Sequence, residues 1–213
     1  MELIGLVGKA GSGKDTVANM LVDKGYIRVA SADTMKDDLC RYLDIPHNEF
    51  EQYKNIPLKA VHTEHGYHHM DGFDRFGKNR IYGKFAFNFS LRRLLQQYGM
   101  DMRDHFGPDY WISRSVKNIL DTEEVFVEES KKQVVISDIR FQNEWDYVKS
   151  MGGRIVLIKG REELTKEEQK QHVTEQLATN PSTEIEADVI ITNNGSLQDL
   201  KDKVEATIWI KNI

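Results

Sequence analysis

The sequence predicts an α/β fold built on a five-stranded parallel sheet with helices on both faces. Short apolar runs recur along the chain, segments with helical spacing of apolar residues separate them, and Gly- or Asn-containing turns join the two kinds of segment. Strands that alternate with helices are joined by right-handed crossovers, which make the sheet parallel and cover both of its faces. At 213 residues, the chain has the length of one domain.

The first part of this pattern lies within about residues 1–43. Glu2–Val7 is a short apolar run typical of a buried parallel strand. A helix is expected over Asp15–Lys24, where apolar residues share one face and Gly25 can end the helix. A strand over Tyr26–Ala30 and a helix over about 34–43 complete a strand–helix–strand unit.

Residues 44–87 contain Pro, Gly and many aromatic residues without a sustained period, which indicates a functional insertion or lid. The predicted core is therefore about 1–43 and 88–213, with an irregular or helical insertion at 44–87 and a lid at about 160–178. In the second part, strands are expected over Gln133–Asp138, Arg154–Lys159 and Ala187–Thr192, and helices over about 88–98, 109–120, 142–151, 164–177 and 197–208.

Composition excludes several classes of protein. Lys and Arg total 29 against 34 Asp and Glu, a net charge of −5, which argues against a nucleic-acid polymer as partner. No window approaches the ~18 apolar residues of a membrane span, and Met1–Leu6 lacks the basic region of a secretory signal. The single Cys40 excludes an internal disulfide, fits a reducing compartment and is expected to be a small buried residue.

The strongest motif is the turn over residues 8–16, Gly-Lys-Ala-Gly-Ser-Gly-Lys-Asp-Thr. Its glycines let backbone N–H groups face phosphate oxygens, and the following helix adds its positive end. Lys14 is expected to reach the β- and γ-phosphates of a nucleotide. A Gly-rich turn without ligand is the alternative, which Gly13–Lys14 after an apolar strand argues against. This motif predicts a three-layer P-loop NTPase fold with nucleotide bound by Gly8, Lys9, Ala10, Gly11, Ser12, Gly13, Lys14, Asp15 and Thr16.

Three residues are expected near Mg²⁺: Asp15, Thr16 and Asp138. Asp15 occupies the usual Ser/Thr position of the motif, and Thr16 follows one residue later. Asp138 closes an apolar strand, where doubly wound sheets present ligand-binding groups, and can hold Mg²⁺ through water. Its alternative role is an N-cap for the following helix. Lys9 either adds charge at the phosphates or is a solvated surface residue.

Two further groups of polar residues are candidates. Arg140 is placed to pair with a phosphate or with Asp138, and Asn143 and Glu144 either orient Arg140 or cap a helix. Arg92 and Gln96 are four residues apart on one helical face, where an Arg can clamp a phosphate and an amide can read a base edge. Solvated helix charge is the alternative. Arg103 lies at the exit of that helix, and Trp111 fits either the core or a base-stacking surface.

Two charged or His-rich stretches remain open to interpretation. His62, His65, His68 and His69 have zinc-ligand spacing, yet no Cys accompanies them, so a polar insertion is favoured. Arg161, His172 and Glu175 lie in a highly charged stretch that is either a lid over the phosphates or a solvated helix face.

Motifs over nearly the whole chain carry a resemblance to a known family: Gly8…Gly13-Lys14-Asp15-Thr16, Arg92…Leu95-Gln96…Gly99, Gly107-Pro-Asp-Tyr-Trp111, Ser137-Asp-Ile-Arg-Phe-Gln-Asn-Glu144, His172…Glu175 and Asp188…Asn193-Asn194-Gly195. With these motifs the chain resembles the deoxynucleoside monophosphate kinases, including phage-encoded ones, within the P-loop kinases. The resemblance departs at Met100, where the family usually has Thr, and in Val61–Met70, which has no counterpart.

The resemblance implies ATP with Mg²⁺ on residues 8–16 and a deoxynucleoside 5′-monophosphate (dNMP) between residues 31–36 and the helix that carries Arg92. Lys14, Arg140, Asp138 and Arg92 are the implied catalytic residues, and Arg161 is an implied ATP contact. The implied substrate contacts are Ser31, Asp33, Lys36, Arg92, Gln96, Arg103, Trp111, Asn143, Glu144, His172 and Glu175.

Two alternatives stay open. One is a P-loop kinase for another small phosphorylated acceptor, such as dephospho-coenzyme A, and the other is a nucleotide-sensing module without turnover. The expected partners are small-molecule nucleotides, with no nucleic-acid polymer and no membrane, and a homodimer is left open. The expected location is the cytoplasm, that of the host if the protein is phage-encoded.

Overall fold

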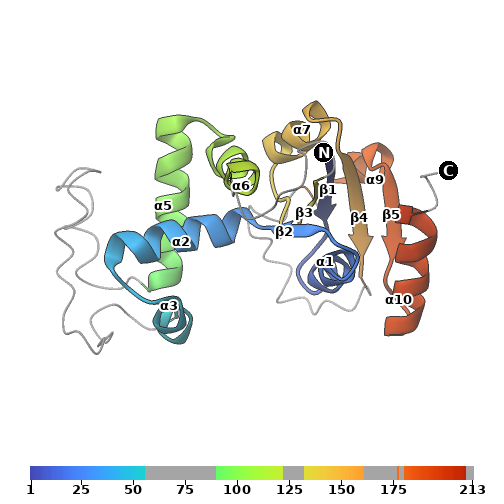
Figure 1. Cartoon of the computed structure of the whole chain (residues 1–213), viewed down its shortest axis with the longest axis horizontal. Coiled ribbons are helices and arrows are strands. Elements are labelled where there is room, and N and C mark those ends of the chain that lie inside the picture. The colour runs from blue at the N-terminus through green and yellow to red at the C-terminus, as the bar shows by residue number, and fades with distance from the viewer. Residues whose placement is uncertain (56–89, 122–131, 161–176, 178–179, 210–213) are drawn as a thin grey trace. The chain divides into compact units, whose positions relative to one another are not determined.

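The computed structural model describes residues 1–55, 90–121, 132–160, 177 and 180–209 (Figure 1). The chain divides into two compact units, and each is described by itself. The first unit comprises Met1–Ser31 and Ile112–Ile213 and contains the sheet. The second unit, Ala32–Trp111, is helical in its described part.

The sheet of the first unit has five strands in the order β2-β3-β1-β4-β5, and every neighbouring pair is parallel. This confirms the predicted five-stranded parallel sheet. The central β1 is flanked by β3 and β4, and Gly5 of β1 pairs with Ile136 on one side and Ile155 on the other. The strands are β1 (Glu2–Val7), β2 (Ile27–Val29), β3 (Gln133–Ile136), β4 (Arg154–Lys159) and β5 (Val189–Thr192).

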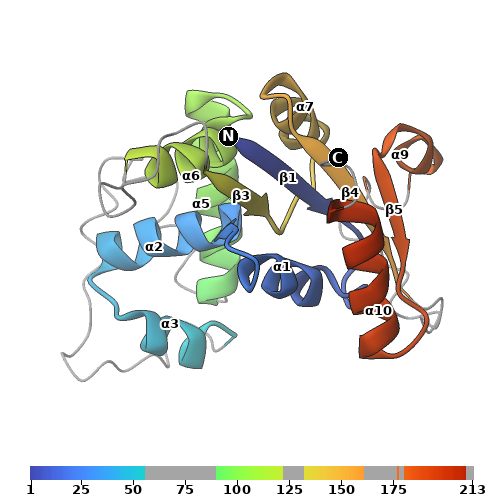
Figure 2. The ribbon, with the colours of Figure 1, turned by 45° about the vertical axis from the view of Figure 1, so that its right-hand side comes forward.

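Helices cover both faces of this sheet, as the sequence predicts (Figure 2). On one face, α1 (Lys14–Val22) and α10 (Leu197–Val204) pack buried residues such as Leu21 and Leu200 against the strands. A short π-helix, Glu205–Trp209, continues α10. On the other face, α7 (Gln142–Ser150) and residues from Ile112 onward in α6 (Tyr110–Asp121) bury Trp145, Val148 and Val116. The strands β1, β3 and β4 are thus buried on both sides, which explains their continuous hydrophobic runs.

One helix of the first unit is missing from the prediction. Helix α9, Pro181–Glu186, has only six residues, which is too short to display a helical period. It begins at Asn180, whose side chain accepts a hydrogen bond from the Ser182 backbone. Within the described ranges, no helix combines the length and apolar character needed to cross a membrane.

The second unit contains most of α2 (Ser31–Leu43), together with α3 (His47–Tyr53) and α5 (Leu91–Phe106). Its core joins residues of all three helices and ends at Trp111. Helices α2 and α5 are also linked by a hydrogen bond from the Tyr98 hydroxyl to Asp38 at 2.6 Å. The buried residues of this core are Leu39, Cys40, Ile45, Phe50, Leu91, Leu94, Tyr98, Met102 and Trp111.

Two elements of the second unit differ from the prediction. Helix α5 was expected to end near residue 98 and instead continues to Phe106. A Cβ on Gly99 would lie 2.6 Å from the sulfur of Met35, so this glycine permits close packing of α5 on α2, which outweighs its low helix propensity. Helix α3 lies in the stretch expected to be irregular, where seven residues are too few to show a period. Residues 56–87 of the predicted insertion lie outside the described residues.

Candidate active site

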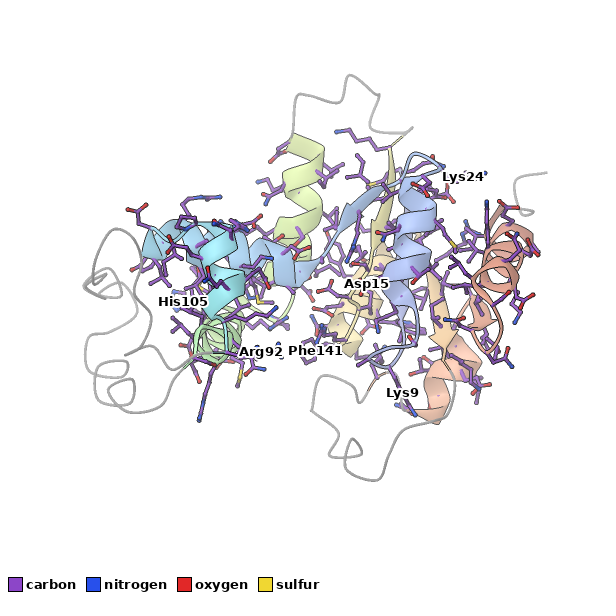
Figure 3. All side chains as sticks on the ribbon, turned by 90° about the horizontal axis from the view of Figure 1, so that it is seen from below. Lys9, Asp15, Lys24, Arg92, His105 and Phe141 are labelled. Carbon is purple, nitrogen blue, oxygen red and sulfur yellow. The ribbon has the colours of Figure 1, made fainter. Side chains whose placement is uncertain are left out.

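A tight turn joins β1 to α1 and carries the predicted phosphate-binding motif. Gly11 and Gly13 adopt left-handed backbone conformations, with φ of 72° and 100°. The Ser12 backbone N–H donates to the Lys9 carbonyl at 3.1 Å, which closes the turn on itself. Helix α1 begins at Lys14, so its unpaired N–H groups and positive end lie at the turn. Figure 3 shows Lys9 at this end of α1 and Lys24 at the opposite end.

The turn is packed against the carboxyl ends of β4 and β5. A Cβ on Gly8 would lie 2.6 Å from Ser12 Oγ and 2.5 Å from the Ile158 carbonyl, so only glycine fits there. Asn193, directly after β5, donates its side-chain N–H to the Ser12 carbonyl at 3.0 Å. The backbone of Asn193 is itself fixed by the Lys159 carbonyl at 2.7 Å. The shape of the turn is therefore held by tertiary contacts.

Lys14 folds back over the turn. Its Nζ donates to the carbonyl of Gly8 at 2.6 Å and to that of Lys9 at 2.8 Å. Ser12 lies beneath, 2% exposed, and its Oγ has no hydrogen-bond partner among the described residues. A Gly-rich cradle, helical N–H groups, a lysine ammonium and a buried hydroxyl together form a donor set that fits nucleotide phosphates. The binding of a nucleotide phosphate by these residues stays a prediction, which this donor set favours.

Asp15 lies in the first turn of α1 and is engaged by an arginine. Its Oδ1 accepts a hydrogen bond from Arg28 Nη2 at 2.7 Å, an ion pair from β2 to α1. Thr16, the next residue, is half-buried. Within the described ranges, no three His, Cys, Asp or Glu side chains gather as a metal site. The carboxylate of Asp15 therefore has a protein partner, and the placement of Asp15, Thr16 and Asp138 near Mg²⁺ stays a prediction.

The loop after β3 carries Asp138 and Arg140. Asp138 Oδ1 accepts the Ser31 backbone N–H at 3.0 Å, so this carboxylate caps the start of α2 and not that of the following helix α7. The alternative prediction that Asp138 caps a helix is thus correct. The capped helix is α2, whereas the sequence predicted the following helix. The Arg140 side chain is exposed and makes no hydrogen bond or ion pair with any described residue. Ser31 is buried, 2% exposed.

Glu144 shapes the backbone of this loop. The residue is 3% exposed, and its Oε2 accepts the backbone N–H groups of Arg140 at 2.8 Å and Phe141 at 3.3 Å. This arrangement is the capping alternative for Glu144, and its contact with substrate stays a prediction. Asn143 beside it is half-buried. The buried carboxylate thereby sets the backbone from which Arg140 projects.

The second unit carries the predicted acceptor-phosphate residues. Helix α5 begins at Ser90, whose side chain accepts the Arg93 N–H. Arg92 and Gln96 are exposed, and their side chains make no hydrogen bond or ion pair with a described residue. Figure 3 shows Arg92 on the ribbon of the second unit. Such an unpaired guanidinium four residues before an unpaired amide can bind a phosphate ester and its attached group.

Other predicted substrate residues of the second unit have protein partners. Lys36 donates to Glu51 at 3.2 Å and lies 3.7 Å from Asp33; burial acts to lower its pKa, but these carboxylates raise the pKa above its usual value. Arg103 is half-buried and donates to the Gly99 carbonyl at 3.4 Å. Trp111 is 0% exposed, and its Nε1 donates to the same carbonyl at 3.0 Å. Trp111 belongs to the core, so the prediction of a substrate contact is corrected.

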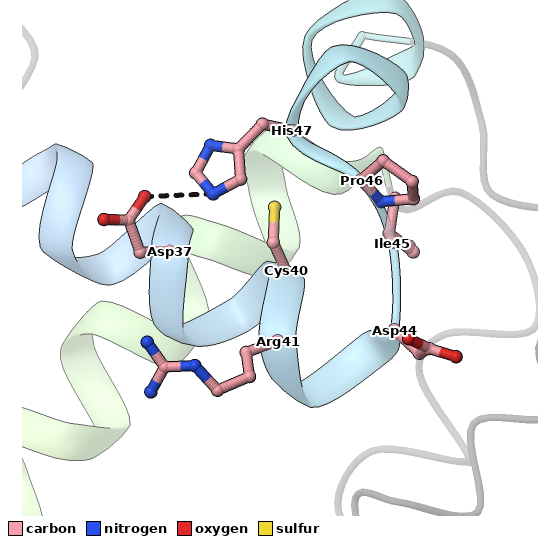
Figure 4. Close-up of a pocket in the computed structure, with 7 residues that line it drawn as sticks. All are labelled: Asp37, Cys40, Arg41, Asp44, Ile45, Pro46 and His47. Carbon is pink, nitrogen blue, oxygen red and sulfur yellow. Dashed lines mark ion pairs between the residues drawn. The ribbon is translucent and has the colours of Figure 1, made fainter.

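An open hollow of about 690 Å³ also lies in the second unit, at the junction of α2 and α3 (Figure 4). His47 Nε2 lies 3.1 Å from Asp37 on its rim. Cys40 lines the hollow, and burial raises the pKa of its thiol to about 11. A protonated thiol is a poor nucleophile, and Cys40 is a small buried residue as expected.

Comparison with known proteins decides the family. A family model described as deoxynucleotide monophosphate kinase matches residues 50–204, well over half of the chain. The chain belongs to the deoxynucleotide monophosphate kinase family. It is 32% identical over 166 residues to a protein of Acanthamoeba polyphaga mimivirus that is provisionally named as such a kinase, with 74% of each chain covered. It is 25% identical to the deoxynucleotide monophosphate kinase of Enterobacteria phage T4, covering 99% of this chain and all of the relative.

A solved structure supports the same fold. The crystal structure of TT1252 from Thermus thermophilus has a TM-score of 0.50 and 19% identity, with 100% of this chain and 98% of that chain covered. As a member of the deoxynucleotide monophosphate kinase family, the chain is a phosphotransferase with the role of a nucleotide kinase. The three-layer α/β P-loop fold predicted from the sequence is confirmed.

Arg161, His172 and Glu175 of the predicted lid lie outside the described residues, and so do the four His of Val61–Met70, a stretch without a counterpart in the family that the chain resembles. Conversely, Arg28 and Asn193 contact the phosphate-binding region and were not selected from the sequence. Arg28 could have been noticed as a charge inside an otherwise apolar strand. Asn193 was recognised only as part of a turn motif.

Proposed function

We propose that this kinase transfers the γ-phosphoryl group of ATP to a deoxynucleoside 5′-monophosphate, giving the diphosphate and ADP. The proposal rests on two observations: the turn of the first unit has a donor set that suits phosphates, and Arg92 and Gln96 of the second unit make no side-chain hydrogen bond or ion pair with a described residue. A nucleotide switch without turnover needs only the first of these. The relatives' printed names support a monophosphate as acceptor.

In the proposed reaction, an oxygen of the dNMP phosphate attacks the γ-phosphorus in line. The bond from that phosphorus to the β–γ bridging oxygen breaks, and ADP leaves with the bonding electron pair. The acceptor phosphate is already ionised at neutral pH, so the enzyme has no proton to remove. Catalysis then consists of positioning the two substrates and neutralising charge.

The residues of the proposed site have three roles: they bind the ATP phosphates, bind the acceptor and neutralise the transferring group. The backbone N–H groups of the turn and Lys14 bind the β- and γ-phosphates, with the Lys14 ammonium exchanging its carbonyl partners for phosphate oxygens. Arg92 clamps the acceptor phosphate, and Gln96 contacts its nucleoside. Arg140, exposed on a backbone held by Glu144, neutralises the transferring group.

Mg²⁺, when bound with ATP, neutralises charge on the phosphate oxygens. Thr16 is the hydroxyl available to hold it, and Asp138 is the carboxylate, directly or through water. Both residues follow the carboxyl ends of central strands, where ligands of doubly wound sheets bind. The Asp138 Oδ1 also holds Ser31, which fixes the carboxylate in place.

The test is a substrate panel with product identification by chromatography. The four common dNMPs, their ribonucleotide counterparts and dephospho-coenzyme A are each offered with ATP and Mg²⁺. The proposal predicts a diphosphate product from at least one dNMP and none from dephospho-coenzyme A. Lys14→Met should reduce turnover by about 10²- to 10³-fold with an unchanged circular dichroism spectrum. Phosphorylation of dephospho-coenzyme A alone would replace the proposed acceptor.

A further inference from the structure

Arg28, the central residue of the short strand β2, joins three polar side chains. Its Nη2 donates to Asp15 at 2.7 Å, its Nε donates to Ser137 Oγ at 3.1 Å, and its Nη1 lies 3.5 Å from Asn19 Oδ1. Asp15 and Asn19 are one turn apart on α1, and Ser137 directly follows β3. All four residues belong to the first unit. A planar guanidinium with five N–H groups suits such a three-way contact.

These contacts connect the two parts of the phosphate site. Asp15 lies between Lys14 and Thr16 at the start of α1, and Ser137 precedes Asp138 in the loop after β3. The sheet already fixes β2 beside β3, through the pairing of Val29 with Ile136. Arg28 extends that fixed geometry to the first turn of α1. The helix that carries Lys14 is thereby held relative to the loop that carries Asp138.

The charge of Asp15 gives the contact a second consequence. This acid occupies a position where phosphate-binding turns usually have a neutral hydroxyl, and its side chain is 78% exposed. A carboxylate there benefits from the positive end of α1, yet it repels a nucleotide triphosphate bound at the same end. Arg28 is the cation that neutralises this carboxylate. Exposed ion pairs contribute little to the free energy of folding. The expected effect of this pair is therefore on the electrostatic potential at the start of α1, where the triphosphate is proposed to bind.

We propose that Arg28 is a positioning residue for phosphoryl transfer. It neutralises Asp15 and ties α1 to the Ser137–Arg140 loop, so that ATP and its metal engage Lys14, Thr16 and Asp138 without competition from the Asp15 carboxylate. This inference rests on the proposed function, because it assigns the triphosphate to the start of α1. It also removes Asp15 from the predicted metal ligands.

The proposal predicts an asymmetric effect of removing either partner. Arg28→Gln leaves a bare carboxylate at the phosphate site and should raise the KM for ATP by about fivefold to tenfold, with a smaller change in kcat. Asp15→Asn removes the repelling charge and should leave the KM for ATP equal to or below that of wild type. The double variant should recover most of the loss, because no uncompensated carboxylate remains. Arg28→Lys should show an intermediate KM, since it retains the charge without the planar contacts.

The experiment measures the KM for ATP and kcat of wild type and of the four variants at saturating dNMP, in low and in moderate salt. The Arg28→Gln defect should shrink as salt rises, because screening weakens the repulsion. Lys24→Gln is the matched control: it removes an exposed cation, paired with Glu205 at 3.9 Å, from the opposite end of α1. Its KM for ATP should stay at the wild-type value. Thermal unfolding of every variant checks that the fold is retained.

Two results would overturn the proposal: an unchanged KM for ATP in Arg28→Gln, or a double variant no better than Arg28→Gln alone. Calorimetric titration with ATP gives the same ranking of affinities without turnover. If wild type binds ATP but forms no ADP in response to any dNMP, the proposed function fails. The order of ATP affinities measured by calorimetry would then still test whether Arg28 supports binding of the triphosphate.

Discussion

Asn193 and Ser12 are 181 residues apart in sequence, yet the Asn193 side-chain N–H donates to the Ser12 carbonyl at 3.0 Å. The bond fastens the phosphate-binding turn to the end of β5, at the position where Gly13 has no room for a side chain. Residues from the two ends of the chain thus build one site. The N–H groups of the turn face a ligand only while its carbonyls are held elsewhere.

Asn193→Ala should therefore weaken ATP binding. A lost hydrogen bond that leaves an unsatisfied carbonyl costs about 1–3 kcal/mol, or roughly a fivefold to hundredfold rise in the Kd for ATP. The Kd is measured by calorimetry. Gln198→Ala removes another amide, one that bonds Asp202 on the surface of α10, and should leave the Kd unchanged. Equal affinity in both variants would mean that the turn keeps its shape without Asn193.

Glu144 should support catalysis through the backbone of Arg140. Glu144→Ala removes the acceptor of two backbone N–H groups and should lower kcat and the melting temperature together. Glu144→Gln keeps an acceptor oxygen and should restore most of both quantities. If Glu144 contacts substrate as the sequence predicted, Gln should fail to restore kcat even where it restores stability.

Arg92 should act on the acceptor. Arg92→Ala is expected to raise the KM for dNMP by about tenfold or more, the effect of losing a charge-assisted contact, with the KM for ATP unchanged. Arg93→Ala is the matched comparison, because this neighbour on α5 is also exposed and points about 100° away around the helix. An equal loss in both variants would indicate a general charge effect and not a specific clamp.

Glu2, at the amino end of the central strand β1, should make stability depend on pH. Burial tends to raise its pKa, but hydrogen bonds from Gln133, Tyr26 and Arg154 outweigh burial and leave the pKa below its usual value. A lowered folded-state pKa stabilises the protein above the ordinary glutamate value of about 4.3, and this stabilisation is lost as pH falls through the folded-state pKa. The melting temperature of wild type should exceed that of Glu2→Gln at pH 7, and the difference should shrink below about pH 4. A difference that stays constant with pH would contradict this.

The sequence predicted the elements whose signals are local. Glu2–Val7 and Arg154–Lys159 match β1 and β4 residue for residue, because each is an apolar run bounded by glycines or charges. The extent of α5 could not be predicted, since Gly99 is tolerated in that helix only through its packing on Met35. The phosphate-binding turn was recognisable from its glycines and Lys14. The contacts of Arg28 with Ser137 and of Asn193 with Ser12 depend on strand order and register, which no local pattern contains.

The position of Trp111 in the core likewise could not be predicted from local sequence. An aromatic residue after Gly107 and Pro108 fits a base-stacking surface or a core equally well in sequence. The structure resolves the choice, because Tyr98 lies 5.5 Å from its ring and the Gly99 carbonyl accepts its N–H. Trp111 therefore belongs to the core of the second unit.

The most direct test of the central claim follows the label from [γ-³²P]ATP in the presence of each dNMP. Label should move to a deoxynucleoside diphosphate in an amount equal to the ADP formed, and both products should depend on added dNMP. Lys14→Met should reduce this transfer by about 10²- to 10³-fold. Release of label as inorganic phosphate at the same rate with and without every dNMP would contradict the account.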